Sequence, residues 1–173
     1  FGDRCFGMFD CLDENTHAKD LSKVHRDFDA SILSEKKFFA NFIAGHESEK
    51  NIRGDFFKSL CNYRRVESPG TYLNNMEGDY VVDFKNNSKI DFQKKCKFTL
   101  CFESTQHYGF VTEKIVDAYL ANTVPIYFGS STINTIFNPK SFINVADFNC
   151  FDDVIAYIKK IDQNDDLYLE MLN

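Results

Sequence analysis

The chain has 173 residues, a net charge of −6 and a hydrophobic content of 43%. This length suits one domain with a full core, and the composition is that of a globular protein. The acidic balance argues against nucleic acid and anionic membranes as partners, because phosphate-rich surfaces are bound by clustered Lys and Arg. No stretch reaches the ~18 apolar residues of a membrane-spanning helix. We also see no export leader, although the sequence starts in mid-pattern and an upstream portion stays open.

The first half of the chain predicts an irregular segment followed by buried elements. Residues 1–35 show no sustained period, and we expect a connecting segment with one short helix near 21–28. The apolar run from Lys37 to Gly45 predicts a strand buried on both faces. Residues 52–63 carry apolar side chains at helical spacing. A second strand is predicted at 63–66, before a loop rich in Pro, Gly and Asn at 68–79.

The second half alternates strands with helices. Ser88 is expected to cap a helix that ends near Cys96. The elements then predicted are a strand at 97–103, a loop at 104–111, a helix at 112–122, a strand at 123–129, a short helix at 131–137, a strand at 141–145, and helices at 152–161 and 165–172. This alternation predicts right-handed crossovers and an α/β, Rossmann-like parallel sheet with helices on both faces. Residues 36–173 are expected to form one ligand-binding domain.

The loop at 104–111 is the predicted site, because ligands of open α/β sheets bind beyond the carboxyl ends of the strands. Thr112 is a good cap for the following helix, whose first turn offers N–H groups and a positive dipole to a phosphate. Lys114 adds a positive charge there, and Glu113 supplies an acceptor suited to a sugar hydroxyl. These groups suit a phosphate and a sugar hydroxyl, as a nucleotide sugar would offer. Ordinary helix capping beside a solvated lysine fits the same spacing, and spacing alone leaves that alternative open.

The six cysteines show neither a CxxC pair nor a histidine at zinc-finger spacing. Cys96 and Cys101 fall in an apolar strand pattern and are expected to be small core residues. Without an export signal we expect reduced thiols, and a bridge between Cys5 and Cys11 is the alternative.

A resemblance to a known family sharpens the hypothesis for the site. The string KFTLCFESTQHYGFVTEKIVDAYLANTVPIYFGS resembles the signature of the α1,3/4-fucosyltransferases, in particular the bacterial (Helicobacter-type) enzymes that add Lewis-type fucose to lipopolysaccharide O-chains. Agreement over roughly 36–172, with several motifs in order, is specific. The residues in register are Phe102, Glu103, Tyr108, Thr112, Glu113, Lys114, Ala118, Pro125, Tyr127 and Gly129, and the segment IRGDFF resembles an upstream family helix.

The resemblance implies the carboxyl-terminal, donor-binding half of a two-domain GT-B fold. It implies inverting transfer of L-fucose from GDP-fucose to the 3-OH (or 4-OH) of N-acetylglucosamine in a lactosamine-type glycan acceptor. By resemblance, Arg53 and Lys114 grip the diphosphate and Glu113 binds a donor hydroxyl. The other donor-binding residues that it implies are Ser104, Tyr108, Phe110 and Thr112.

Two departures from the family pattern keep alternatives open. The family usually has Asn where this chain has Ser104, and Tyr where it has Phe110, so a same-fold transferase with another nucleotide sugar is the second hypothesis. A third is a non-catalytic nucleotide-binding domain. It arises because the family's general base comes from an amino-terminal domain, and nothing in residues 1–36 resembles that domain. We therefore assign no catalytic residue.

No metal or other cofactor is expected, because two cations and a helix amino end can stabilise the leaving diphosphate. The acidic pairs Asp152-Asp153 and Asp165-Asp166 are predicted to be helix-start charges and not a metal-binding motif. The resemblance also leads us to expect a cytoplasmic protein at the inner face of a bacterial inner membrane. Peripheral attachment would use tail segments that family members carry outside the matched region.

Overall fold

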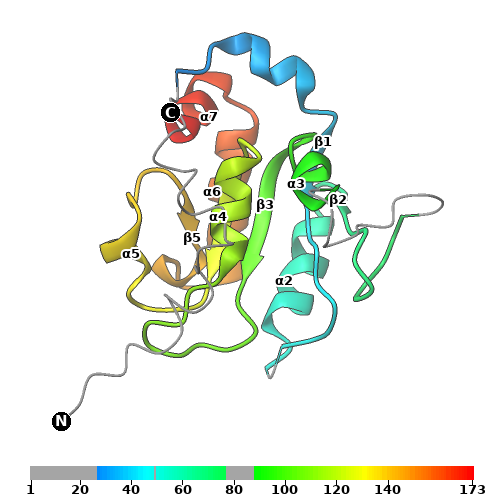
Figure 1. Cartoon of the computed structure of the whole chain (residues 1–173), viewed down its shortest axis with the longest axis vertical. Coiled ribbons are helices and arrows are strands. Elements are labelled where there is room, and N and C mark those ends of the chain that lie inside the picture. The colour runs from blue at the N-terminus through cyan, green and yellow to red at the C-terminus, as the bar shows by residue number, and fades with distance from the viewer. Residues whose placement is uncertain (1–26, 49, 77–87) are drawn as a thin grey trace.

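The computed structural model describes residues 27–48, 50–76 and 88–173. Within them, one parallel sheet has the strand order β2-β1-β3-β4-β5. The strands are β1 (Phe38–Asn41), β2 (Val66–Glu67), β3 (Cys96–Phe102), β4 (Val124–Phe128) and β5 (Ile143–Asn144). The helices are η1 (Ala30–Glu35), α2 (Ile52–Cys61), α3 (Ser88–Gln93), α4 (Glu113–Leu120), α5 (Ile133–Ile136), η2 (Val145–Asp147), α6 (Phe151–Asp162) and α7 (Asp165–Leu172). Figure 1 shows β3 crossing the centre of this arrangement.

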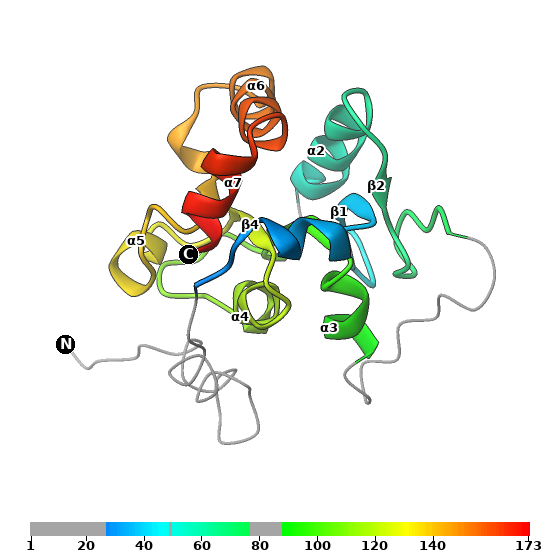
Figure 2. The same cartoon turned by 90° about the horizontal axis from the view of Figure 1, so that it is seen from above.

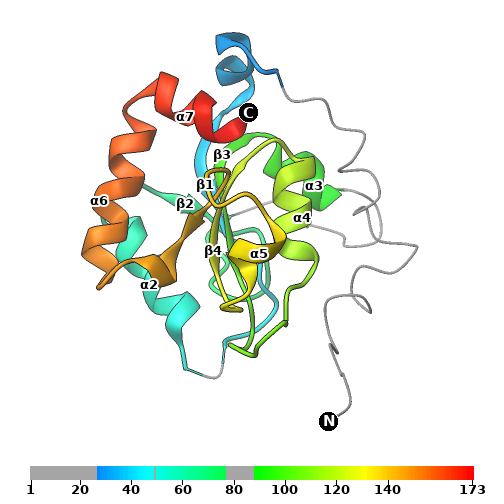
Figure 3. The ribbon, with the colours of Figure 1, turned by 90° about the vertical axis from the view of Figure 1, so that its left-hand side faces the viewer.

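Helices cover both faces of the sheet. Seen from above and from the side, α2 and α6 lie on one face while α3 and α4 lie on the other (Figures 2 and 3). Successive side chains of a strand point to opposite faces. Phe98, Leu100 and Phe102 of β3 accordingly join the core under α2 and α6, whereas Cys101 joins the core under α4. The predicted Rossmann-like α/β fold is therefore confirmed.

The register of the central strands positions the loops that follow them. Phe98 pairs with Val124 and Phe102 with Phe128, so β3 and β4 end at the same level. The loops after both strands consequently leave from one edge of the sheet, beside the amino ends of α2 and α4. This is the place where open α/β sheets bind ligands.

Most elements lie where the sequence predicts them, and the differences have local causes. The strand predicted at 63–66 begins only at Val66, because the backbone N–H groups of Tyr63 and Arg64 still donate to the Leu60 carbonyl oxygen at the end of α2. Ser88 is the first residue of α3 and not a residue preceding it. The predicted connecting segment contains η1, whose start is held by the Asp29 carboxylate accepting from the Ser31 N–H.

One further expectation falls mostly outside the described residues. The helix predicted near 21–28 lies outside the described residues, apart from residues 27 and 28, which have no regular structure. Among the described helices, none combines the length and the apolar character needed to cross a bilayer.

The cysteines of β3 are core residues, as predicted. Cys96 and Cys101 are fully buried free thiols, Cys150 is exposed, and Cys5 and Cys11 lie outside the described residues. Burial raises the pKa of the Cys96 thiol to about 12 and raises that of Cys101 well above its usual value. Because the thiolate is the nucleophile, both buried groups should be inert.

We expect iodoacetamide to alkylate Cys150 in the folded chain near neutral pH while Cys96 and Cys101 stay unmodified. Peptide mass mapping after brief labelling measures this directly. The same reaction in denaturant should modify all three, and rapid labelling of Cys96 in the folded chain would contradict the burial described.

Candidate functional site

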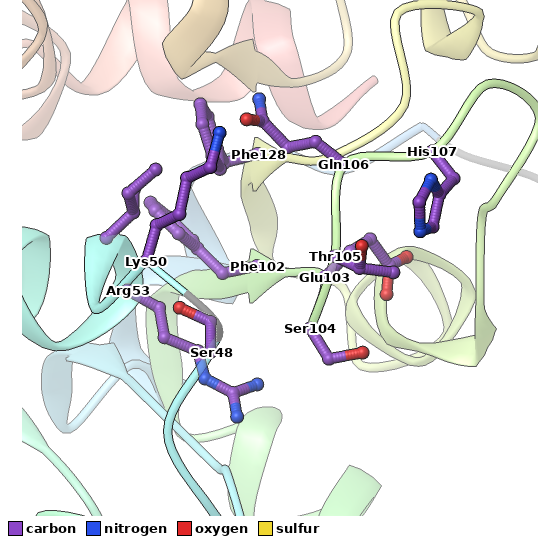
Figure 4. A pocket seen from close by; sticks show the side chains of 11 residues that line it. Ser48, Lys50, Arg53, Phe102, Glu103, Ser104, Thr105, Gln106, His107 and Phe128 are labelled. Atoms are coloured by element: carbon purple, nitrogen blue, oxygen red, sulfur yellow. The ribbon is translucent and has the colours of Figure 1, made fainter.

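A pocket of about 170 Å³ opens at the carboxyl ends of β3 and β4. Its walls come from the segment before α2, the first turn of α2, the ends of the two strands and the loop after β3. Figure 4 shows Arg53 on the α2 side, with Ser104 and His107 on the opposite loop. The residues that matter most for its chemistry are Lys50, Arg53, Glu103, Ser104 and His107.

Arg53 places a buried positive charge beside this pocket. The residue is only 3% exposed, and one guanidinium N–H donates to the His46 carbonyl oxygen. Its Nε lies 4.0 Å from Glu47 Oε1 and has no hydrogen-bond partner among the described residues. Burial lowers the pKa of Arg53, and the carboxylates of Glu47 and Glu103 partly offset that effect. The pocket therefore borders a cation that still has a free donor within the described structure.

Glu103 is a buried carboxylate at the end of β3. Its backbone N–H donates to the Phe128 carbonyl oxygen at 2.8 Å, which extends the β3–β4 ladder by one bond. The carboxylate accepts from the Thr112 N–H at 2.8 Å, from the Thr112 hydroxyl at 2.7 Å and from the Lys114 ammonium at 3.0 Å. None of its side-chain surface is exposed. This carboxylate thus ties the central strand to the amino end of α4.

Gly129 leaves the space that Glu103 occupies. A Cβ atom at position 129 would lie 2.6 Å from Glu103 Cγ and 2.5 Å from the Tyr127 hydroxyl oxygen. Contacts this close are not tolerated, and neither group can withdraw, because both belong to the packed end of the sheet. Glycine is therefore required here by close approach.

Alternating charges continue from Glu103 along α4. The Lys114 ammonium also donates to the Thr112 hydroxyl at 2.8 Å and lies 3.9 Å from Glu113 Oε1. Lys89 of α3 lies 3.8 Å from the same Glu113 oxygen and 2.6 Å from Asp117 Oδ2. Burial alone would raise the pKa of Glu113, but the charges of Lys114 and Lys89 outweigh it and hold the pKa below its usual value. Glu113 is therefore an ionised acceptor.

The loop after β3 is anchored to the loop after β4. The Gly109 N–H donates to the Ser130 hydroxyl oxygen at 2.9 Å, and the Thr132 N–H donates to the same oxygen at 3.2 Å. Gly109 has a φ of +77°, in the left-handed region that favours glycine. The loop is thus held at its far end as well as at β3.

The structure brings together some of the predicted site residues and separates others. Arg53 and Ser104 line the pocket. The other predicted donor-binding residues, Tyr108, Phe110, Thr112, Glu113 and Lys114, do not line it, and Lys114 is linked to it only through Glu103. Thr112 stands at the predicted cap position, but its hydroxyl donates to Glu103 and makes no capping bond to α4. The predicted cap position is confirmed, but the capping bond is absent, and the hydroxyl oxygen accepts from the Lys114 ammonium.

Glu103 itself was missed as the centre of this network. A glutamate that ends a strongly apolar strand is the signal that could have revealed it, because fully buried glutamates are almost always paired. The acidic pairs Asp152-Asp153 and Asp165-Asp166 lie in the first turns of α6 and α7, as predicted. Among the described residues, no group of three or more His, Cys, Asp or Glu is arranged to hold a metal ion.

Comparison with known proteins identifies the family. Residues 33–173 match the family model of glycosyltransferase family 10 (fucosyltransferase), C-terminal region. The chain belongs to this family. The family 10 chain is 44% identical over 137 residues to the alpha-(1,3)-fucosyltransferase FucT of Helicobacter pylori, covering 79% of the chain and 27% of that protein. It is 39% identical over 143 residues to the mouse 4-galactosyl-N-acetylglucosaminide 3-alpha-L-fucosyltransferase 9. That match covers 82% of the family 10 chain and 38% of the mouse protein.

A solved structure agrees with these relatives. The crystal structure of an α1,3-fucosyltransferase with GDP-fucose superposes with a TM-score of 0.72 at 43% identity, covering 80% of the family 10 chain and 39% of that protein. The resemblance predicted from the sequence is confirmed. The chain spans well under half the length of each of these relatives.

We expect Gly129→Ala to destabilise the fold by about 1–3 kcal/mol, because the added methyl group overpacks the end of the sheet. Urea unfolding followed by circular dichroism measures the change. Gly45→Ala is the matched control, since a Cβ there would meet only the Thr71 hydroxyl oxygen at an ordinary 3.8 Å. Equal stability of the two variants would contradict the close approach at Gly129.

Proposed function

We propose that this chain binds GDP-fucose at the pocket between α2 and the loop after β3 and forms the donor half of a fucosyltransferase. The observation that carries the proposal is Arg53, a buried cation beside the pocket whose Nε has no partner in the described part of the chain. A diphosphate oxygen supplies the missing hydrogen-bond acceptor and adds a negative charge to that of Glu47, whose Oε1 lies 4.0 Å from Nε. The likeness to a solved α1,3-fucosyltransferase with GDP-fucose supports this choice of ligand.

The pocket holds only part of such a donor. Its volume of about 170 Å³ is below the roughly 300 Å³ or more that a complete small-molecule site occupies. We assign it to part of the diphosphate, which extends past Glu103 to Lys114 at the amino end of α4, with the sugar and the nucleoside extending along the loop after β3. Ser104 then contributes a hydroxyl at the pocket wall, while Tyr108 and Phe110 contact the donor beyond the pocket.

Each charged group has a role in the transfer. Negative charge grows on the leaving β-phosphate in the transition state, so Arg53 and Lys114 stabilise that state more than the ground state. Glu113 accepts a hydrogen bond from a donor hydroxyl, and Thr112 holds the Lys114 ammonium. With two cations at the diphosphate, the proposal requires no metal and no other cofactor.

The complete reaction extends beyond this chain. We propose inverting transfer of L-fucose to the 3-OH (or 4-OH) of N-acetylglucosamine in a lactosamine-type glycan. The acceptor site and the general base come from the part of the relatives that this chain does not match. A cytoplasmic location at the inner face of a bacterial inner membrane belongs to the same proposal and rests on the resemblance to the Helicobacter-type enzymes alone.

A second candidate is the same fold with another nucleotide sugar. Ser104 lies on the pocket wall, where the family pattern has Asn, so the hydrogen bonds offered to the donor differ there. Each lost hydrogen bond changes the binding free energy by about 1 kcal/mol, which is large enough to alter the preferred sugar.

We expect calorimetric titration of the chain to show tighter binding of GDP-fucose than of GDP-mannose or UDP-galactose. The shared diphosphate gives all three a common contribution, and the base and the sugar set the order. Tighter binding of a donor without fucose would favour the second candidate. Absence of binding by all three would reject a donor site.

Arg53→Ala and Lys114→Ala should each weaken GDP binding by about tenfold or more, since hydrogen bonds to charged groups contribute about 1.5–3 kcal/mol. Titration calorimetry measures both, with circular dichroism to verify folding. Arg65→Ala is the control, because the Arg65 guanidinium pairs with Glu67 on β2 and borders no part of the pocket. Unchanged GDP binding in both site variants would reject the assignment.

A further inference from the structure

Glu103 stands among the cations of the proposed donor site without the chemistry of a phosphate ligand. A carboxylate repels a diphosphate, yet this one borders the pocket and is fully buried. Its three hydrogen bonds all go to Thr112 and Lys114. We propose that Glu103 is a positioning residue, which fixes the Lys114 ammonium and the amino end of α4 for the diphosphate. The inference rests on the proposed function of the same site.

The geometry at Lys114 shows what is fixed. An ammonium group has three N–H donors. One points to Glu103 Oε2 at 3.0 Å and a second to the Thr112 hydroxyl at 2.8 Å. Within residues 27–48, 50–76 and 88–173 the third donor has no hydrogen-bond acceptor, because Glu113 Oε1 lies 3.9 Å away, and we assign this donor to the incoming ligand. The two hydrogen bonds to Glu103 and Thr112 therefore fix the direction in which the third N–H of the Lys114 ammonium points.

Lysine needs such anchoring more than arginine does. Its flexible four-carbon stem loses rotamer freedom whenever the ammonium is held in one place. Lys114 is 24% exposed, so without Glu103 its ammonium would move into solvent. An ammonium that is already held in the empty protein loses less freedom when the donor binds.

The network calls for a carboxylate in particular. Three groups donate to Glu103: the Thr112 N–H, the Thr112 hydroxyl and one N–H of the Lys114 ammonium. Only an ionised carboxylate accepts all three without offering a donor in return. A glutamine of the same shape would direct an NH₂ group at the Thr112 hydroxyl or at the ammonium. The buried charge of Glu103 is balanced by Lys114, and the Arg53 guanidinium also lies within electrostatic range of it.

The packed end of the sheet holds Glu103 in place, and Glu103 in turn holds the Lys114 ammonium. Its backbone continues the β3–β4 ladder through Phe128, and the absence of a side chain at Gly129 allows its Cγ to lie against the end of β4. Glu113, in contrast, has a side chain that is 45% exposed and makes only long contacts to Lys114. The anchor of the ammonium is therefore the carboxylate of the strand and not that of the helix.

A double-mutant cycle on GDP binding tests this role. Titration calorimetry compares the unmodified chain with Glu103→Gln, Lys114→Ala and the double variant. If Glu103 acts through Lys114, Glu103→Gln weakens GDP binding about tenfold alone and less than about twofold in the Lys114→Ala background, because residues that act as a unit are not additive. Equal losses in both backgrounds, or no loss in the single variant, would overturn the inference.

Matched variants separate positioning from general damage to the fold. Glu67→Gln removes another largely buried carboxylate, at the end of β2 on the edge of the sheet, paired with Arg65 at 3.0 Å and without contact to Lys114. It should bind GDP as the unmodified chain does. A loss as large as that of Glu103→Gln would show that any buried charge matters, and would overturn the specific role.

A second variant serves if Glu103→Gln does not fold. Thr112→Val removes the hydroxyl that joins Glu103 to Lys114 but keeps the backbone N–H bond to Glu103. It should weaken GDP binding about threefold to tenfold, and only while Lys114 is present. The outcomes stay distinguishable: failure of the unmodified chain to bind GDP rejects the proposed function, whereas additive losses reject only the positioning role.

Discussion

The bond network of the Glu103 carboxylate joins the sheet to the site. Pairing of Phe102 with Phe128 brings β3 and β4 to a common end, and Glu103 follows as the next residue of the ladder. From that fixed position it accepts three hydrogen bonds from the amino end of α4. The position of Lys114 therefore depends on strand register, which is among the most strongly specified properties of a sheet buried on both faces.

The strand order brings the helices that carry the two cations to the same edge of the sheet. Arg53 and Lys114 are far apart in the sequence, but each lies in the first turn of a helix beside the carboxyl ends of neighbouring strands. Because β1 pairs with β3, the pocket receives Arg53 from the α2 side and Ser104 from the loop after β3 (Figure 4). The polar groups of the site thus come from a rigid, apolar framework, as in other parallel α/β sheets.

The sequence predicts the elements of the second half well because their apolar runs are long and regular. β3, α4 and β4 fall within a few residues of their expected bounds. Weaker local signals fail: the turn after α2 delays β2 to Val66, and η1 was not expected. At the site, the family resemblance identifies Arg53 and Ser104 as pocket residues, but neither resemblance nor pattern identifies the partner of Thr112. Whether its hydroxyl oxygen accepts from an α4 N–H or from the Lys114 ammonium depends on packing between β3 and α4, which spacing along the chain does not encode.

The hydrogen bond that Arg53 Nε lacks in the described structure also affects the stability of the fold. A buried guanidinium whose Nε has no acceptor among the described residues costs free energy in the empty protein. A nucleotide sugar that supplies the acceptor binds only the native state and stabilises it by mass action. Chain abundance and donor supply are then linked in the cell, because unfolded chains are removed by proteases. A shortage of donor would reduce the amount of protein as well as its occupancy.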